Sequence, residues 1–224
     1  MINHLIRSAL LSKLNNPRFA YIAPTFKQAK SIAWDYMKQF TAKIPHTKFN
    51  ETELRVDLPN GSRITLLGSE SPDGLRGIYL DGCVIDEYAN VNSKLFPEII
   101  RPALSDRKGY CVFIGTPMGM NNNFYELYQH AQGADDWFNY KAKASDTKIV
   151  DNDELVKAKE VMGEKKYQQE FECDWIANIE GAVYGDVIAK LDDDKHLTRV
   201  PYDPALPVST CLLYTSPSPR DNKA

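Results

Sequence analysis

The segment Cys83-Val84-Ile85-Asp86-Glu87-Tyr88-Ala89 constrains the fold more than any other part of this chain. An uninterrupted apolar run that ends at polar turn residues is typical of a strand buried on both faces of a parallel sheet. Ligands of open α/β sheets bind beyond the carboxyl ends of such strands, so we predict that Asp86 and Glu87 lie at a binding site. The first carboxylate suits the coordination shell of Mg²⁺, and the second suits polarising a water molecule. A strand end that simply meets solvent is the alternative.

The composition is that of an ordinary globular chain. Of its 224 residues, 43% are hydrophobic and 25% are charged, which is enough to bury a core. No apolar stretch approaches the roughly 18–20 residues of a membrane span, and the first residues lack the pattern of a secretory signal, so we expect an intracellular protein without membrane contact. The cysteines lie far apart without CxxC spacing, which predicts reduced thiols rather than disulfides or a zinc site. They are Cys83, Cys111, Cys173 and Cys211.

Charge is segregated along the chain. Residues 1–50 carry eight Lys or Arg and a single acid, Asp35, although the formal charge of the whole chain is −3. A basic segment of this kind is suited to contact with phosphate backbones, and solvated helix faces are the alternative. For Lys27 and Lys30 the solvated helix face is the favoured description.

The periodicity of the first half predicts alternating helices and strands. An amphipathic helix is expected from Ile2 to Leu10, followed by a strand over residues 19–23 and by Pro24-Thr25 as turn and helix cap. The next helix is expected to turn its apolar positions inward, namely Ala29, Ile32, Ala33, Tyr36, Met37 and Phe40. Alternating residues on either side of Pro59-Asn60-Gly61 predict a β-hairpin over residues 54–66.

The second half continues the pattern. We expect a helix over residues 93–104, a strand over residues 110–114 that runs into Gly115-Thr116-Pro117, and a helix over residues 124–131. A further strand over residues 137–142 and a charged helical segment over residues 153–175, broken at Gly163, complete the prediction. The fold class is therefore α/β, with a mostly parallel sheet flanked by helices and a hairpin at one edge.

The last residues read as a non-native tail. Residues 211–221 back-translate to a DNA sequence that resembles a transposase-type sequencing-library adapter. We therefore exclude residues 211–224 from the fold prediction. A natural disordered Pro/Ser tail is the alternative and predicts equally little order.

Five short motifs occur in an order that identifies a family resemblance. They are Ala23-Pro24-Thr25, Leu75-Arg76-Gly77, Val84-Ile85-Asp86-Glu87-Tyr88-Ala89, Gly115-Thr116-Pro117 and Asn123-Phe124-Tyr125-Glu126-Leu127-Tyr128. The chain resembles the large subunit of tailed-bacteriophage terminases from its first helix to about residue 210. The resemblance implies a P-loop NTPase-like (ASCE) motor domain that uses ATP and Mg²⁺ to drive viral DNA into a procapsid. An RNase H-like nuclease domain that cuts the DNA concatemer follows the motor in that family.

The resemblance also implies roles for single residues. Asp86 looks like the Walker B residue that holds Mg²⁺ through water, and Glu87 looks like the residue that activates the attacking water. Gly115-Thr116-Pro117 looks like the coupling motif, and Pro24-Thr25 looks like a segment close to DNA or nucleotide. Arg76 resembles an arginine finger inserted by a neighbouring subunit. A loop arginine paired with Asp73 or Asp81 is the alternative for Arg76, and a plain turn hydroxyl is the alternative for Thr116.

Two expected elements are missing from the sequence. No GxxxxGK[ST] phosphate loop occurs, and the acids expected of the nuclease site are absent beyond Glu180-Gly181-Ala182-Val183-Tyr184, which resembles the start of that domain. Asp192-Asp193-Asp194 reads as a solvated charge run rather than a metal site. We therefore expect a chain cut at both ends and inactive alone.

The expected organisation follows. Residues 1–143 form the ATPase domain without its Walker A loop, residues 144–178 a helical lid or linker, residues 179–210 the beginning of the nuclease domain, and residues 211–224 the tail. The family resemblance implies double-stranded viral DNA, a portal protein, the terminase small subunit and a homo-oligomeric ring as partners. It places the parent protein in the cytoplasm of the infected bacterium, transiently docked on the procapsid and absent from the mature virion.

Three other classes of protein remain as alternatives. A superfamily 2 helicase fragment shares the acid pair, but that family prefers Ala-Asp or Ala-His where Tyr88-Ala89 stands. A nonenzymatic nucleic-acid-binding module using the basic first quarter would bind in a salt-dependent manner and survive Glu87→Ala. A Rossmann-type enzyme ranks last because no GxGxxG follows a strand.

Overall fold

The computed structural model describes residues 1–176, 187, 190–191 and 194–196. The chain divides into two compact units, Met1–Ile179 and Glu180–Ala224. All helices and strands named below belong to the first unit. The predicted start of a nuclease domain at residues 180–184, Asp192 and Asp193, and the tail from Cys211 lie outside the described residues.

A mostly parallel six-stranded sheet forms the centre of the first unit, with the strand order β2-β3-β4-β1-β5-β6. The strands are β1 (Arg18–Ala23), β2 (Lys48–Asn50), β3 (Arg55–Asp57), β4 (Arg63–Gly68), β5 (Gly82–Ile85) and β6 (Tyr110–Phe113). Strand β1 is parallel to β4 and β5, and β5 is parallel to β6, whereas β2 and β3 run antiparallel at the other edge. The predicted α/β class is thus confirmed, together with the hairpin formed by β3 and β4.

The register brings the carboxyl ends of the four parallel strands together. Ala23 of β1 lies opposite Gly68 of β4, Ile22 lies opposite Ile85 of β5, and Ile85 lies opposite Phe113 of β6. The turns that follow these strands therefore meet at one end of the sheet, where open α/β proteins bind their ligands.

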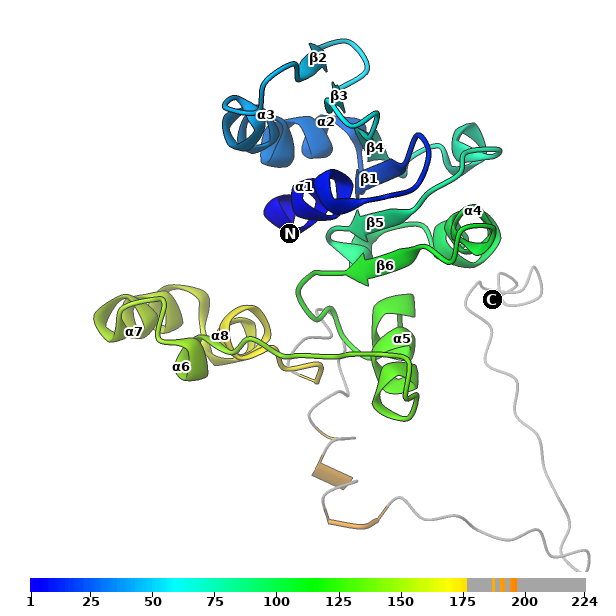
Figure 1. Cartoon of the computed structure of the whole chain (residues 1–224). Helices are drawn as coiled ribbons and strands as arrows, with labels where there is room; N and C mark the ends of the chain where they lie inside the picture. Colours follow the sequence, from blue (N-terminus) through cyan, green and yellow to red (C-terminus); the bar gives the residue numbers. More distant parts are fainter. Residues whose placement is uncertain (177–186, 188–189, 192–193, 197–224) are drawn as a thin grey trace, which may run out of the picture. The chain divides into compact units, whose positions relative to one another are not determined.

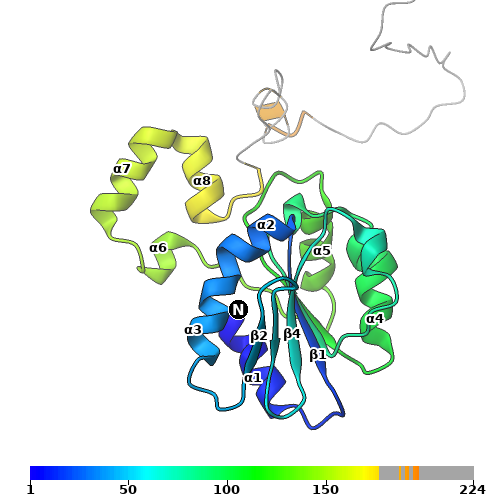
Figure 2. The same cartoon turned by 90° about the horizontal axis from the view of Figure 1, so that it is seen from above.

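Helices cover both faces of this sheet (Figures 1 and 2). One face carries α1 (Ile2–Leu11) and a continuous helical segment made of α2 (Phe26–Ala29), the π-helical η1 (Lys30–Trp34) and α3 (Asp35–Thr41). The other face carries η4 (Leu95–Ile100), α4 (Arg101–Ser105) and α5 (Asn123–Gln132). Each face has its own apolar cluster, the first around Leu5, Tyr21 and Met37 and the second around Ile22, Ile85 and Ile100.

Only half of the residues predicted to face inward on the helical segment α2-η1-α3 are buried. Ala29, Ala33 and Met37 are buried, whereas three predicted core residues are exposed: Ile32 at 41%, Tyr36 at 55% and Phe40 at 41%. The π-helical turn explains the difference, because its hydrogen bonds span one residue more than those of an α-helix and rotate the following residues. Trp34 and Thr41 take the inward positions instead.

Two other predictions need correction. Residues 137–142 form no strand, and their alternating aromatic residues are exposed, with Phe138 at 89% and Tyr140 at 71%. This segment pairs with no strand of the described sheet, and an alternating pattern alone does not form a strand without such pairing. The helix predicted from Ser93 begins at Leu95 and starts with a π-helical turn.

Three helices after residue 143 form a small helical unit: α6 (Ala144–Thr147), α7 (Asn152–Met162) and α8 (Glu164–Glu172). Gly163 separates α7 from α8, as predicted, with a positive φ of 78°. The unit has its own apolar cluster around Leu155 and Tyr167. Beyond α8, Trp175 packs against Phe124, Tyr125 and Tyr128 of α5 at ring distances of 5.2–5.4 Å, which holds the helical unit against the sheet domain.

Candidate functional site

The turn after β5 holds Asp86 in a defined orientation. The Asp86 N–H donates to the carbonyl of Ile22 on β1 at 2.8 Å, which extends the sheet by one residue. The Oδ1 atom of Asp86 accepts the N–H of Glu87 at 2.9 Å, and its Oδ2 atom accepts the hydroxyl of Tyr21. Both carboxylate oxygens thus have a protein donor, while the residue itself is half-buried.

Glu87 adopts a strained backbone beside Asp86. Its φ of 48° and ψ of 46° are left-handed, a conformation that a residue with a Cβ adopts at a cost. The neighbouring Tyr88 N–H donates to the carbonyl of Ile114 at 3.1 Å, which ties the turn to the end of β6. Burial, followed by the nearby carboxylates of Asp86 and Glu170, raises the pKa of the Glu87 carboxyl.

Gly115 lets the end of β6 approach this acidic turn closely. A Cβ atom on Gly115 would lie 3.1 Å from the backbone N of Tyr88 and 3.3 Å from the Cα of Glu87. Thr116 is half-buried and Pro117 is buried. The carbonyl of Pro117 accepts a hydrogen bond from Nε2 of Gln169 at 2.7 Å, so α8 contacts the turn that touches Glu87.

A surface hollow of about 340 Å³ opens beside Asp86. It is lined by Met1 and by residues of α1, β1, η1, α3 and the segments after β5 and β6, namely Ile2, Asn3, Tyr21, Ile32, Tyr36, Phe40, Asp86 and Ile114. Asp86 and Ile114 both line it, so the turn after β5 meets the end of the β6 segment here. The hollow leaves space for a ligand next to the carboxylate.

Pro24 and Thr25 follow β1 at the same end of the sheet. Thr25 caps α2, because its side chain accepts the N–H of Gln28 at 3.1 Å. The next N–H, of Phe26, donates to the carboxylate of Glu70 at 2.9 Å and 3.1 Å. The predicted turn and cap are thus present, and an acid already occupies the helix N-terminus beside them.

Arg76 lies in the loop between β4 and β5 and is exposed. Its guanidinium pairs with Asp73 at 2.8 Å and with Glu98 at 3.4 Å. Within the described residues it makes no hydrogen bond or ion pair with Asp86 or Glu87. The pairing with Asp73 matches the alternative that the sequence left open, and the pairing with Asp81 does not form.

Three residues near the site escaped the sequence prediction: Tyr21, Gln169 and Glu170. Tyr21 reads as a core strand residue, and only the register of β1 against β5 shows that its hydroxyl reaches the next turn. Gln169 and Glu170 lie on α8, where no local pattern distinguishes them from other polar helix residues. Their positions depend on tertiary packing alone.

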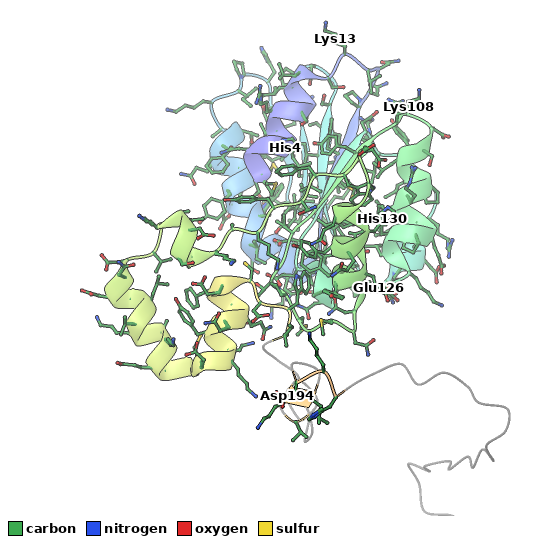
Figure 3. The ribbon with its side chains drawn as sticks, turned by 90° about the horizontal axis from the view of Figure 1, so that it is seen from below. His4, Lys13, Lys108, Glu126, His130 and Asp194 are labelled. Carbon is green, nitrogen blue, oxygen red and sulfur yellow. The ribbon has the colours of Figure 1, made fainter. Side chains whose placement is uncertain are left out.

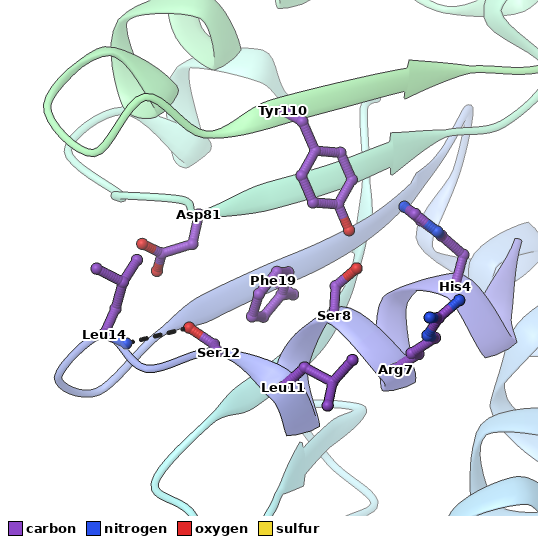
Figure 4. Close-up of a pocket in the computed structure, with 9 residues that line it drawn as sticks. All are labelled: His4, Arg7, Ser8, Leu11, Ser12, Leu14, Phe19, Asp81 and Tyr110. Atoms are coloured by element: carbon purple, nitrogen blue, oxygen red, sulfur yellow. Dashed lines mark hydrogen bonds between the residues drawn. The ribbon is translucent and has the colours of Figure 1, made fainter.

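Lys13 and Lys108 are exposed at the opposite end of the sheet, far from Glu126 of α5 (Figure 3). A second hollow, of about 410 Å³, lies between α1 and the start of β6. Figure 4 shows the Tyr110 hydroxyl directed toward Ser8 in this hollow, and the ring of His4 meets the Tyr110 ring at 5.2 Å.

The donor set at Asp86 fits a hydrated magnesium ion. Within the described part of the chain, no group of three or more His, Cys, Asp or Glu residues is arranged to hold a metal. A full protein cage is therefore absent from that part, and a single oriented carboxylate beside open space suits Mg²⁺, which keeps several waters and shares its shell with phosphate oxygens.

No described helix has the length and apolar character to cross a bilayer.

The fold and this site define an open α/β protein whose candidate ligand site lies at the carboxyl ends of its parallel strands. The chain belongs to the terminase large subunit family, because the family model described as terminase large subunit, T4likevirus-type, N-terminal, matches residues 7–186. The terminase large subunits of Thermus phage G20c and Thermus virus P23-45 are each 30% identical over 126 residues, which cover 48% of this chain. The match spans 26% of the length of each relative.

Solved structures share the fold. The ATPase domain of the large terminase of Thermus phage P74-26 superposes with a TM-score of 0.62 at 22% identity, covering 75% of this chain and 80% of that one. The large terminase of a thermophilic bacteriophage gives a TM-score of 0.65 at 14% identity, covering 78% of this chain and 44% of that one. Further structures of that second protein are complexes with ADP and with ATP-gamma-S.

Proposed function

We propose that this chain carries the ATP-hydrolysing site of a motor that translocates viral genomic DNA into a procapsid. The observation that carries the proposal is the placement of Asp86 and Glu87 at the end of strand β5, which lies between β1 and β6, against the turn at Gly115. Membership of the terminase large subunit family supports this function over the helicase-like and nonenzymatic alternatives. The nucleotide complexes of the thermophilic bacteriophage terminase support ATP as the ligand.

Asp86 and Glu87 take different roles in this proposal. Asp86, oriented by two hydrogen bonds, holds Mg²⁺ through water. The ion, when bound, offsets negative charge on the phosphate oxygens. Glu87 orients and polarises the attacking water, and its raised pKa makes its carboxylate a better proton acceptor than an ordinary glutamate.

The surrounding turns supply the remaining functions. Gly115-Thr116-Pro117 couples the state of the nucleotide to the rest of the molecule, because it touches Glu87 on one side and Gln169 on the other. Pro24 and Thr25 lie close to nucleotide or DNA at the same end of the sheet. Arg76 acts on the site of a neighbouring subunit as an arginine finger, for which its exposed position is suitable.

The wider organisation is proposed from the family. Residues 1–143 form the motor domain, residues 144–178 a lid or linker, residues 179–210 the start of a nuclease domain and residues 211–224 a non-native tail. The complete protein cuts the DNA concatemer and works as a homo-oligomeric ring with a portal protein and the terminase small subunit. It acts in the cytoplasm of the infected bacterium and docks transiently on the procapsid. Because no GxxxxGK[ST] loop occurs in the sequence, we expect no turnover of MgATP by this chain alone.

The test measures ATP hydrolysis by the complete large subunit that carries this sequence, with and without double-stranded DNA. We expect Glu87→Gln to lower kcat by about 10²- to 10⁴-fold, the range that general acid–base catalysis contributes. Glu126→Gln is the matched control, because Glu126 is an exposed acid of α5, near the same end of the sheet. Unchanged kcat in the Glu87→Gln protein would refute the proposed site.

A further inference from the structure

We infer that Tyr21 positions the carboxylate of Asp86 for the metal ion. The inference rests on the proposed function and adds a residue that the sequence motifs do not contain. Tyr21 acts through Asp86 and does not itself contact the reacting atoms, so its role is that of a positioning residue.

The geometry of the strand pair creates this contact. Tyr21 lies in the middle of β1, directly opposite Val84 of β5 in the parallel register. Its side chain is 2% exposed and extends toward the carboxyl end of the sheet, where its hydroxyl donates to Oδ2 of Asp86. The partner of the hydroxyl is thus fixed by the register, 65 residues further along the chain.

The hydrogen bonds leave part of the carboxylate available. An ionised carboxylate offers about four lone-pair directions, and the Tyr21 hydroxyl and the Glu87 N–H use two of them. The hollow of about 340 Å³ is lined by both Tyr21 and Asp86, so the free directions have space for a hydrated ion. Without the Tyr21 hydroxyl, the Asp86 carboxylate keeps only the hydrogen bond from the Glu87 N–H. That bond fixes one carboxylate oxygen but not the plane of the carboxylate.

Residues that orient a metal ligand influence affinity strongly. Mutation of such partners costs about 10- to 100-fold in metal affinity or activity. We expect the low end of this range for Tyr21, because the Glu87 N–H still holds Oδ1 of Asp86 at 2.9 Å when the phenol is gone. If the Tyr21 hydroxyl only satisfied its own hydrogen bond in the core, removing it would leave metal affinity unchanged.

The experiment measures the affinity of Mn²⁺, used as a spectroscopic substitute for Mg²⁺, in the complete subunit with ADP present. The loss of the free-ion electron paramagnetic resonance signal gives the dissociation constant. Tyr21→Phe removes one oxygen atom from a buried ring. Tyr110→Phe is the matched control, because Tyr110 is a half-buried strand tyrosine that lines the second hollow, at the opposite end of the sheet. Val84→Ala controls for stability, since it removes buried packing next to Tyr21 and leaves the hydroxyl in place.

The expected outcomes separate positioning from packing. Tyr21→Phe weakens Mn²⁺ binding about tenfold, whereas Tyr110→Phe and Val84→Ala bind like the wild type, although Val84→Ala melts at a lower temperature. Equal affinity of the Tyr21→Phe and Tyr110→Phe proteins, with weaker binding by Asp86→Asn, would overturn the role of Tyr21 alone. Wild-type affinity in the Asp86→Asn protein would instead refute the metal site of the proposed function.

Discussion

We expect Glu87 to destabilise the folded chain. Its backbone is left-handed, with φ 48° and ψ 46°. That conformation costs an L-residue roughly 1–2 kcal/mol, and strain of this kind is concentrated at functional sites. The side chain adds a second cost, because burial and the carboxylates of Asp86 and Glu170 disfavour its charged form. We therefore expect substitutions of Glu87 to stabilise the fold and remove the activity.

The backbone contribution can be isolated by comparing Glu87→Gly with Glu87→Ala. Both variants lose the carboxylate, but alanine keeps the Cβ that makes the left-handed conformation costly. Glycine avoids that cost of roughly 1–2 kcal/mol and loses about 0.4–1 kcal/mol through its more flexible unfolded chain. We expect the glycine variant to be more stable than the alanine variant by about 0.5–1 kcal/mol. Urea unfolding of the chain, followed by far-ultraviolet circular dichroism, measures this difference.

The charge contribution appears in the pH dependence of the stability difference between the wild type and Glu87→Gln. The pKa of the Glu87 carboxyl is raised above its ordinary value of 4.5 in the folded state, so the folded chain binds the proton more tightly than the unfolded chain does. The wild type therefore loses stability relative to Glu87→Gln as the pH rises from 4.5 through the raised pKa, and the difference is constant above it. An alanine variant as stable as the glycine variant would refute the strained backbone. A difference between wild type and Glu87→Gln that does not change with pH would refute the perturbed carboxyl.

Three further substitutions test other parts of the structure. Gly115→Ala places a Cβ 3.1 Å and 3.3 Å from backbone atoms that cannot rotate away, so it should cost about 1–3 kcal/mol in urea unfolding, whereas Gly133→Ala meets nothing within 4 Å and should be nearly neutral. Trp175→Ala removes the aromatic contact with α5 and should lower the stability of the folded chain by about 3–5 kcal/mol. Amide hydrogen exchange in α8 should then become faster. Ile176→Ala, at a site 65% exposed, should leave this exchange unchanged. Arg76→Ala should leave the unfolding midpoint unchanged because its ion pairs are exposed, and should lower ATP hydrolysis by the ring about 10³- to 10⁵-fold if it acts as a finger.

The sequence predicts those parts of the fold that local patterns specify. The apolar runs at β5 and β6 each end in a distinctive turn, and parallel strands place such turns at one end of a sheet. These patterns predict a binding site at Asp86 and Glu87, and Gly115 lies beside Glu87 at the same end of the sheet. Strand β2 (Lys48–Asn50) gave no signal, because three residues are too short for a period and only its pairing with β3 defines it.

Long-range contacts explain what the sequence could not predict. Ile32, Tyr36 and Phe40 were wrongly predicted to face inward because a π-helical turn changes the direction of side chains along this helix, and no single residue predicts that turn. The strand predicted over residues 137–142 lacked a partner in the sheet. Tyr21 and Gln169 meet their partners across 65 and 52 residues, so their roles depend on the finished topology.

The same contacts connect α8 to the acidic turn by two physical routes. Gln169 holds the carbonyl of Pro117, and Gly115 in the same turn leaves no room for even a methyl group against Glu87. Glu170, the next residue of α8, is one of the charges that raise the pKa of Glu87. A displacement of α8 would therefore release the turn and lower the proton affinity of Glu87 in one step.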